Sequence, residues 1–294
     1  MIPEPVIPEP LRQGLHPLAD GRALGWAEYG DPSGAPLLFF HGTPGCRYTA
    51  ALMAEAAATA GVRLIGVDRP GLGVSDPAPR RTLRDWPDDV VSVADGLGLD
   101  RFAVAGWSGG GVHALACGWR IPDRLTACVV LAGVASPDTP GRGDALAPLL
   151  RAVQVTAVHA PRLSKVWFHL VRMIVPRAKA PSAREQRLDP VGSRPDVWAA
   201  GKRELREAFK QGVAGAHWDY LLNVQPWGFR PEDVTAHVDL WMGEQDRNVS
   251  PGAVRLMVAR FPSCEARFVP GAHYLPVTYG ADIAGLVAER AAAR

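Results

Sequence analysis

The chain has 294 residues, 47% of them hydrophobic, and its 32 Lys+Arg against 30 Asp+Glu give a formal net charge of +2. This length and apolar content are sufficient for one large buried core. The near-neutral charge gives no overall attraction to nucleic acid or to a membrane surface, so we expect neither as a partner. No apolar stretch approaches the roughly 20 residues that span a bilayer, and we therefore expect no membrane span.

The N-terminus and the cysteines both indicate a cytoplasmic protein. Residues 1–14 repeat a Pro-Glu-Pro unit and have neither a basic start nor an apolar run. They are not typical of a signal peptide and predict an extended, poorly ordered arm. The cysteines, Cys46, Cys117, Cys128 and Cys264, lie far apart and form no CxxC pair. We expect reduced, mostly buried thiols, as is usual in the cytoplasm.

Short apolar runs alternate with helix-like segments through the first half of the chain. The segment 21–31 has the pattern of an opening hairpin portion. The predicted strands, each bounded by Gly, Pro or Asp, are 35–42, 62–71, 101–107 and 125–134. The predicted helices between them are 49–60, 85–97 and 109–119. Unbroken apolar strands are typical of sheets buried on both faces, so this rhythm predicts an α/β fold with a doubly wound, mostly parallel sheet.

The rhythm stops between residues 136 and 230, which contain amphipathic stretches broken by prolines and no clear strand. It then resumes with predicted strands at 237–246 and 266–274 and predicted helices at 249–261 and 277–292. The strands after residue 230 are too few to close a second sheet. We therefore expect one α/β core, residues 1–135 and 231–294, with a helical cap, residues 136–230, inserted after the sixth strand.

One serine lies in a glycine-rich turn, Gly106-Trp107-Ser108-Gly109-Gly110, which fits the pattern G-x-S-x-G. The match directly follows a predicted buried strand and directly precedes a predicted helix, which is the context of a nucleophile elbow. Small residues let the strand turn into the helix within a few positions, and the turn raises the serine hydroxyl above the sheet. Ser108 is therefore the candidate nucleophile.

A serine hydroxyl is nearly unreactive at neutral pH, so it needs a base, and the base needs an orienting acid. His273 follows the last predicted strand, at the same edge of the sheet as Ser108. Asp246 lies in the loop after the preceding strand, and Glu244 is the alternative acid. Asp239 starts that strand, and at ~3.3 Å per residue it lies at the opposite edge. The chain order Ser108, Asp246, His273 matches the triad order of one fold.

Five short motifs lie near the ends of the predicted strands: HGTPG (41–45), DRPGLGVSD (68–76), GWSGGG (106–111), GEQD (243–246) and GAHY (271–274). With these motifs the chain resembles the α/β-hydrolase superfamily over nearly its whole length. The resemblance implies an α/β-hydrolase fold with a Ser-Asp-His triad. It also implies that the backbone amides of Thr43 and Gly109 form the oxyanion hole, and that the Thr43–Pro44 peptide is cis.

Five residues are candidates for substrate contact: His41, Trp107, Trp218, Asp219 and Trp227. His41 begins the HGTPG motif, and Trp107 precedes Ser108 in the elbow. The other three lie in the cap, which we expect to cover the pocket and to determine substrate specificity. A position on the surface of a helix is the alternative for Asp219. The sequence has no nucleotide loop, metal cluster or dinucleotide fingerprint, so we expect no cofactor and no metal.

A serine nucleophile favours acyl transfer, whereas the dehalogenases and epoxide hydrolases of the superfamily use an aspartate. We expect hydrolysis of a carboxylic ester, lactone or thioester of a small hydrophobic substrate through an acyl-enzyme on Ser108. The alternatives are a lyase, cyclase or acyltransferase on the same fold, a C–C hydrolase or an iminopeptidase, and a non-catalytic receptor. The resemblance implies that an iminopeptidase would bind its substrate ammonium with acidic cap residues.

The charge of the predicted cap is opposite to that requirement. Residues 136–230 contain 15 Lys+Arg and 8 Asp+Glu, a net charge of +7, whereas the rest of the chain carries −5. A solvated, arginine-rich helix surface would explain this difference. A basic cap could also attract an anionic acyl substrate or an acidic carrier protein that delivers a thioester.

Overall fold

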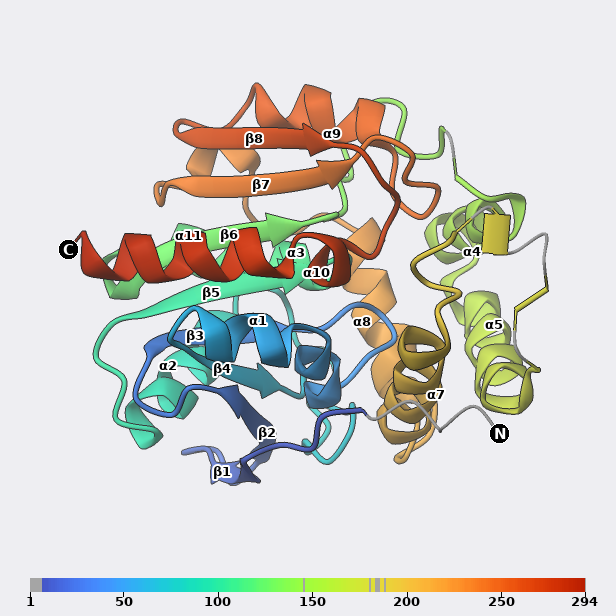
Figure 1. Cartoon of the computed structure of the whole chain (residues 1–294). Coiled ribbons are helices and arrows are strands. Elements are labelled where there is room, and N and C mark those ends of the chain that lie inside the picture. The colour runs from blue at the N-terminus through green and yellow to red at the C-terminus, as the bar shows by residue number, and fades with distance from the viewer. Residues whose placement is uncertain (1–6, 145, 180, 183–185, 188, 294) are drawn as a thin grey trace.

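A mixed sheet organises the chain (Figure 1). The computed structural model describes residues 7–144, 146–179, 181–182, 186–187 and 189–293. In this part of the chain the sheet has eight strands: β1 (Arg12–Pro17), β2 (Ala23–Gly30), β3 (Ala35–Phe40), β4 (Val62–Val67), β5 (Phe102–Trp107), β6 (Leu125–Leu131), β7 (Val238–Gly243) and β8 (Cys264–Val269). Their spatial order is β1-β2-β4-β3-β5-β6-β7-β8. The hairpin β1–β2 and the pair β2–β4 are antiparallel, and all other neighbours are parallel.

Helices cover both faces of this sheet. Helices α1 (Ala54–Thr59) and α11 (Gly280–Ala292) lie on the face turned to the viewer in Figure 1, and α2 (Trp86–Gly96) and α3 (Gly110–Arg120) lie on the other. Every residue of β5, β6 and β7 is consequently buried. Burial on two faces explains why these strands are unbroken apolar runs in the sequence, and the predicted fold class is confirmed.

Three further helices flank the strand ends on the side where the parallel strands finish. They are the 3-10 helix η1 (Arg47–Met53), α9 (Pro251–Val258) and α10 (Leu275–Thr278). The predicted helix 49–60 is thus divided into η1 and α1, and the predicted helix 277–292 into α10 and α11. The prediction gave the position of each helical segment but not the break within it.

The segment between β6 and β7, which we call the cap segment (residues 136–230), is helical. Its described α-helices are α4 (Pro148–His159), α5 (Pro161–Ile174), α7 (Pro195–Ala208) and α8 (Ala214–Val224). Three of them begin with proline, whose fixed φ suits the first helical position. Figure 1 shows the cap segment at the carboxyl ends of the parallel strands, with α8 nearest the sheet. The boundaries at 136 and 230 stay a prediction.

The N-terminal arm and the ends of several strands differ from the sequence prediction. The last residues of the arm 1–14 are ordered, because β1 pairs with β2 and Arg12 forms an ion pair with Glu28 at 2.9 Å; residues 1–6 lie outside the described residues. The strand 62–71 ends at Val67, because the Asp68 carboxylate accepts backbone hydrogen bonds that turn the chain. Within the described ranges, each helix is too short or too polar to span a bilayer.

Candidate active site

The serine of the G-x-S-x-G motif stands at the sharp turn between β5 and α3. Ser108 has φ +55°, a left-handed conformation that a residue with a side chain rarely adopts. The flanking glycines are required by close approach. A Cβ on Gly106 would lie 2.1 Å from the Gly110 carbonyl oxygen, and one on Gly110 would lie 2.1 Å from that of Phe40. The turn therefore lifts Ser108 to the carboxyl edge of the sheet, as the motif predicts.

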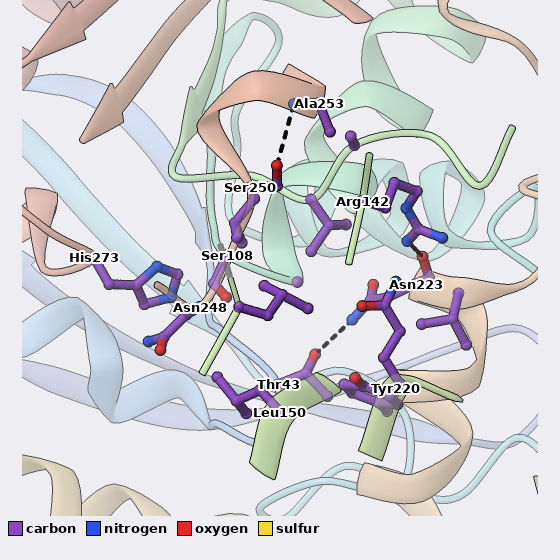
Figure 2. A pocket seen from close by; sticks show the side chains of 17 residues that line it. Thr43, Ser108, Arg142, Leu150, Tyr220, Asn223, Asn248, Ser250, Ala253 and His273 are labelled. Atoms are coloured by element: carbon purple, nitrogen blue, oxygen red, sulfur yellow. Dashed lines mark hydrogen bonds between the residues drawn. The ribbon is translucent and has the colours of Figure 1, made fainter. Parts of the chain in front are cut away.

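His273 and Asp246 come from the loops after β8 and β7 and meet at this edge. The Nδ1 of His273 lies 2.7 Å from Oδ2 of Asp246. The other carboxylate oxygen accepts the backbone N–H groups of Asn248 and Val249 at 2.7 and 3.0 Å, which fixes its orientation. Because Nδ1 faces a carboxylate, it carries the proton, and Nε2 is left as the acceptor. Figure 2 shows the imidazole beside Ser108, and both residues line one cavity.

The contacts of Glu244 and Asp246 distinguish the two candidate acids, and a further contact holds the backbone of His273. Glu244 forms an exposed ion pair with Arg255 at 3.2 Å, whereas Asp246 is buried against His273. The indole N–H of Trp107 donates to the backbone carbonyl of His273 at 2.9 Å. The histidine is thus held both by its ring and by its main chain.

The HGTPG loop passes directly over the elbow. Thr43 and Gly109 both line the cavity, and a Cβ on Gly109 would lie 2.4 Å from Oγ1 of Thr43. The Thr43–Pro44 peptide is cis, as expected. Within the described residues, the amides of Thr43 and Gly109 have no hydrogen-bond acceptor. Two unoccupied N–H groups beside a serine are what an oxyanion hole requires.

A buried ion pair fixes this loop to the cap segment. The Arg69 guanidinium donates to the carbonyls of His41 and Gly42 at 2.6 and 2.9 Å. It also binds both oxygens of Asp219, on α8, at 2.8 and 2.7 Å. The Thr43 hydroxyl donates to the same carboxylate at 2.5 Å. A helix of the cap segment is therefore connected directly to the HGTPG loop.

The structure now permits comparison with known proteins. A sequence profile of the alpha/beta hydrolase fold matches residues 35–278. The chain belongs to the α/β-hydrolase family. A proline iminopeptidase of Neisseria gonorrhoeae is 30% identical over 127 residues, which cover 42% of this chain and 41% of the relative. A 2-hydroxymuconate semialdehyde hydrolase of Pseudomonas sp. (strain CF600) is 38% identical over 117 residues, 37% of this chain and 41% of the relative.

This chain therefore matches less than half the length of these two relatives. Solved structures are similar over almost the whole chain. A thermophilic esterase from Thermogutta terrifontis has a TM-score of 0.66 at 22% identity, and the match covers 95% of this chain and 97% of that one. A likeness at this identity shows the shared fold.

The cavity of this α/β-hydrolase has a volume of ≈ 210 Å³. The apolar residues of its lining are Val134, Ala135, Leu146, Leu150, Val224, Val249 and Ala253. Polar side chains complete it: Thr43, Ser108, Arg142, Gln154, Tyr220, Asn223, Asn248, Ser250 and His273. Within the described lining there is one guanidinium and no carboxylate. This volume suits a small substrate.

None of the five predicted substrate contacts is among the described residues that line this cavity. His41 is buried, and its ring contacts the Gly42 carbonyl and the Arg69 amide. Burial lowers the pKa of His41 well below its ordinary value, so the ring is neutral. Trp107 lies behind His273, where it supports the histidine rather than the substrate.

The three predicted contacts from the cap segment are also corrected. The Trp218 indole N–H donates to the Arg81 carbonyl at 2.9 Å, and Trp227 packs against Phe229 with ring centroids 5.7 Å apart. Asp219 lies neither on a helix surface nor in the cavity, because it is fully buried between two arginines. Burial favours the neutral acid, but Arg69 and Arg81 outweigh it and hold the pKa of Asp219 well below its ordinary value.

Among the polar residues of the cavity wall, the sequence predicts Thr43, Ser108 and His273 but not Arg142, Gln154, Tyr220, Asn223, Asn248 and Ser250. Asn248 and Ser250 could have been found, because they closely follow Asp246 in the loop at the sheet edge. Arg142 and Asn223 lie in the cap segment, where no motif precedes them.

One group outside the site has the composition of a metal site. His237, Asp239 and Glu265 place one ligand atom each within 4.8 Å of the others. They lie at the opposite edge of the sheet from Ser108. Arg290 already contacts both carboxylates, at 2.9 and 3.7 Å, so we interpret the group as a network of ion pairs.

Proposed function

We propose that this α/β-hydrolase is a serine esterase in which Ser108 is the nucleophile. The observation that carries the proposal is the contact of 2.7 Å between His273 and Asp246, made beside a serine held in a left-handed turn at a cavity. A positioned base and its orienting acid are what an unreactive hydroxyl needs.

The proposed reaction has an acylation stage and a deacylation stage. The Nε2 of His273 takes the Ser108 proton as the hydroxyl oxygen attacks the ester carbonyl. The amides of Thr43 and Gly109 donate to the oxyanion that develops, and Asp246 stabilises the imidazolium. The alcohol or thiol leaves with the proton from His273. A water molecule, deprotonated by His273, then cleaves the acyl-enzyme and regenerates the serine.

The cavity lining favours a small ester, lactone or thioester over an N-terminal peptide. The lining includes seven apolar residues that can contact an acyl chain. A substrate with a free ammonium needs a carboxylate to bind it, and the described lining has none. We therefore propose ester hydrolysis in preference to the activity named for the Neisseria relative. The four cysteines are free thiols, which supports the expected cytoplasmic location.

A panel of p-nitrophenyl esters of increasing chain length tests the proposal. We expect short acyl chains to react fastest, because the cavity is small, and a burst of p-nitrophenol when deacylation is slower than acylation. Ser108→Ala and His273→Ala should each lower kcat by roughly 10⁴-fold or more. Ester turnover that survives in Ser108→Ala would contradict the proposal.

A further inference from the structure

The described lining of the cavity contains one arginine, Arg142, and the proposed ester hydrolysis gives this residue no role. It lies in the segment between β6 and α4, and Figure 2 shows it on the side of the cavity away from His273, with Ser108 between them. Its Nη2 donates to the backbone carbonyl of Asn223, near the end of α8, at 2.8 Å. This bond uses one of the five N–H donors of a guanidinium and fixes its position.

The described part of the chain supplies no carboxylate for this cation. Three arginines that are buried around the site, Arg47, Arg69 and Arg81, each form an ion pair with an aspartate at 2.7 Å. For Arg142 no such pair is found among the described residues. Asp138 is an aspartate close enough to act electrostatically on Arg142, but both of its carboxylate oxygens accept hydrogen bonds from Arg260 at 2.9 Å.

Arg142 is partly buried, so its guanidinium is partly desolvated and a bound anion would stabilise it. Desolvation lowers the pKa of Arg142 from its ordinary value, although a guanidinium remains charged at neutral pH. Tyr220 and Asn223, which line the same side of the cavity, add uncharged polar groups but no negative charge. A bound anion would balance the charge and could accept two parallel N–H bonds from the guanidinium.

We propose that Arg142 binds a carboxylate of the substrate, so that this enzyme selects esters that carry a free carboxylate away from the scissile carbonyl. The inference rests on the proposed hydrolysis at Ser108 and names the substrate class for that site. A single guanidinium matches the single charge of a carboxylate, whereas a phosphate dianion would leave one charge uncompensated in a cavity of ≈ 210 Å³.

Two pairs of esters that differ only in charge test the inference. Mono-p-nitrophenyl adipate and its methyl ester place the carboxylate on the acyl side, and 4-acetoxybenzoate and its methyl ester place it on the alcohol side. In the wild-type enzyme, kcat/KM for the acid should exceed that for the methyl ester in at least one pair. In Arg142→Gln that ratio should fall by about tenfold to 100-fold, as expected for a lost charge-assisted hydrogen bond.

Arg162→Gln is the matched control, because Arg162 is an exposed arginine of α5 and the variant loses the same charge. It should leave the ratio within about twofold, since a solvated charge is screened. Arg142→Lys, which keeps the charge but not the planar fork, should give an intermediate ratio and covers the case in which the glutamine variant folds poorly.

Binding separates this inference from the proposed catalysis. Calorimetry on Ser108→Ala should show tighter binding of the preferred acid than of its methyl ester, and the difference should be lost in Ser108→Ala/Arg142→Gln. Equal ratios in Arg142→Gln and Arg162→Gln, or a wild-type enzyme without preference for either acid, would overturn the role of Arg142 and leave Ser108 hydrolysis intact. Turnover in Ser108→Ala would overturn the proposed hydrolysis, and the calorimetric comparison would still decide the role of Arg142.

Discussion

Replacing Asp219 by asparagine removes the charge at the centre of the contact between α8 and the HGTPG loop. The carboxylate accepts from Arg69, Arg81 and the Thr43 hydroxyl, and all of its contacts to the two arginines lie between 2.7 and 2.8 Å. The amide has nearly the same shape, but it leaves two buried guanidinium groups without a counter-charge. The expected result is a lower free energy of unfolding together with a displacement of the HGTPG loop, residues 41–45.

The magnitude follows from the burial of the network. Removing one partner of a buried ion pair costs about 3–5 kcal/mol, because the remaining charge stays desolvated. For a domain of this size each kcal/mol lowers Tm by roughly 2–4 °C, so we expect a decrease of about 6–20 °C. Since Arg69 also holds the carbonyls of His41 and Gly42, kcat should fall by about tenfold to 100-fold as the Thr43 amide loses its position.

Thermal and urea unfolding at neutral pH measure the first effect, and turnover of a p-nitrophenyl ester measures the second. Asp196→Asn is the matched control, because Asp196 pairs with Arg194 on the surface of the same cap segment and both side chains are about half exposed. An exposed pair contributes about 0–1 kcal/mol. Equal changes in Tm for the two variants would refute the reasoning that the buried network stabilises the site.

Three further predictions concern pH, packing and salt. Burial raises the pKa of Glu204, which accepts from Thr49, to about 7, so its stabilising contribution is lost as pH rises from about 4.5 through about 7. In urea unfolding, Glu204→Gln should therefore be more stable than the wild type at about pH 8 and equally stable at about pH 5. The control Glu207→Gln loses the ion pair to Arg47 and should be less stable than the wild type at about pH 8. A Glu204→Gln variant less stable than Glu207→Gln at about pH 8 would contradict this reasoning. Gly109→Ala places a Cβ 2.4 Å from Oγ1 of Thr43 and should lower kcat by about 10²-fold. The control Gly201→Ala, whose Cβ meets no atom within 4 Å, should leave kcat unchanged. Equal effects of the two variants on kcat would show that the contact with Thr43 is not the cause. Salt screens the attraction between the basic cap segment and an anionic ester, with a Debye length of ~10 Å at 0.1 M salt. Added salt should therefore lower kcat/KM for an anionic ester and leave it unchanged for a neutral one. The same salt dependence for both esters would show that the basic cap segment does not steer substrates.

The core of the fold and the meeting of Ser108, Asp246 and His273 at one edge of the sheet could be predicted from the sequence, because local patterns determine them. Buried parallel strands are unbroken apolar runs, and the residues after each strand must meet at one edge of the sheet. Ser108, Asp246 and His273 each follow such a strand, so topology alone brings them together. Strand ends were less certain, because a side chain such as Asp68 can end the ladder.

The cavity wall and the buried network could not be predicted in this way. Asp219 binds residues 150 and 138 positions away, and a lone aspartate on a helix carries no local signal for such partners. Trp218 and Trp227 are predicted ligand contacts because aromatic residues are common in pockets, but aromatic residues also attach a helical segment to a core. Which of these occurs depends on packing between distant helices, which periodicity does not encode.

Covalent labelling of the native enzyme tests the central claim most directly. A fluorophosphonate reacts with an activated serine, and mass spectrometry of the digested protein locates the adduct. We expect one adduct per chain, on the peptide that contains Ser108, and none in His273→Ala, because the hydroxyl then lacks its base. An adduct on another residue, or active enzyme that remains unlabelled, would contradict the assignment of Ser108 as the nucleophile.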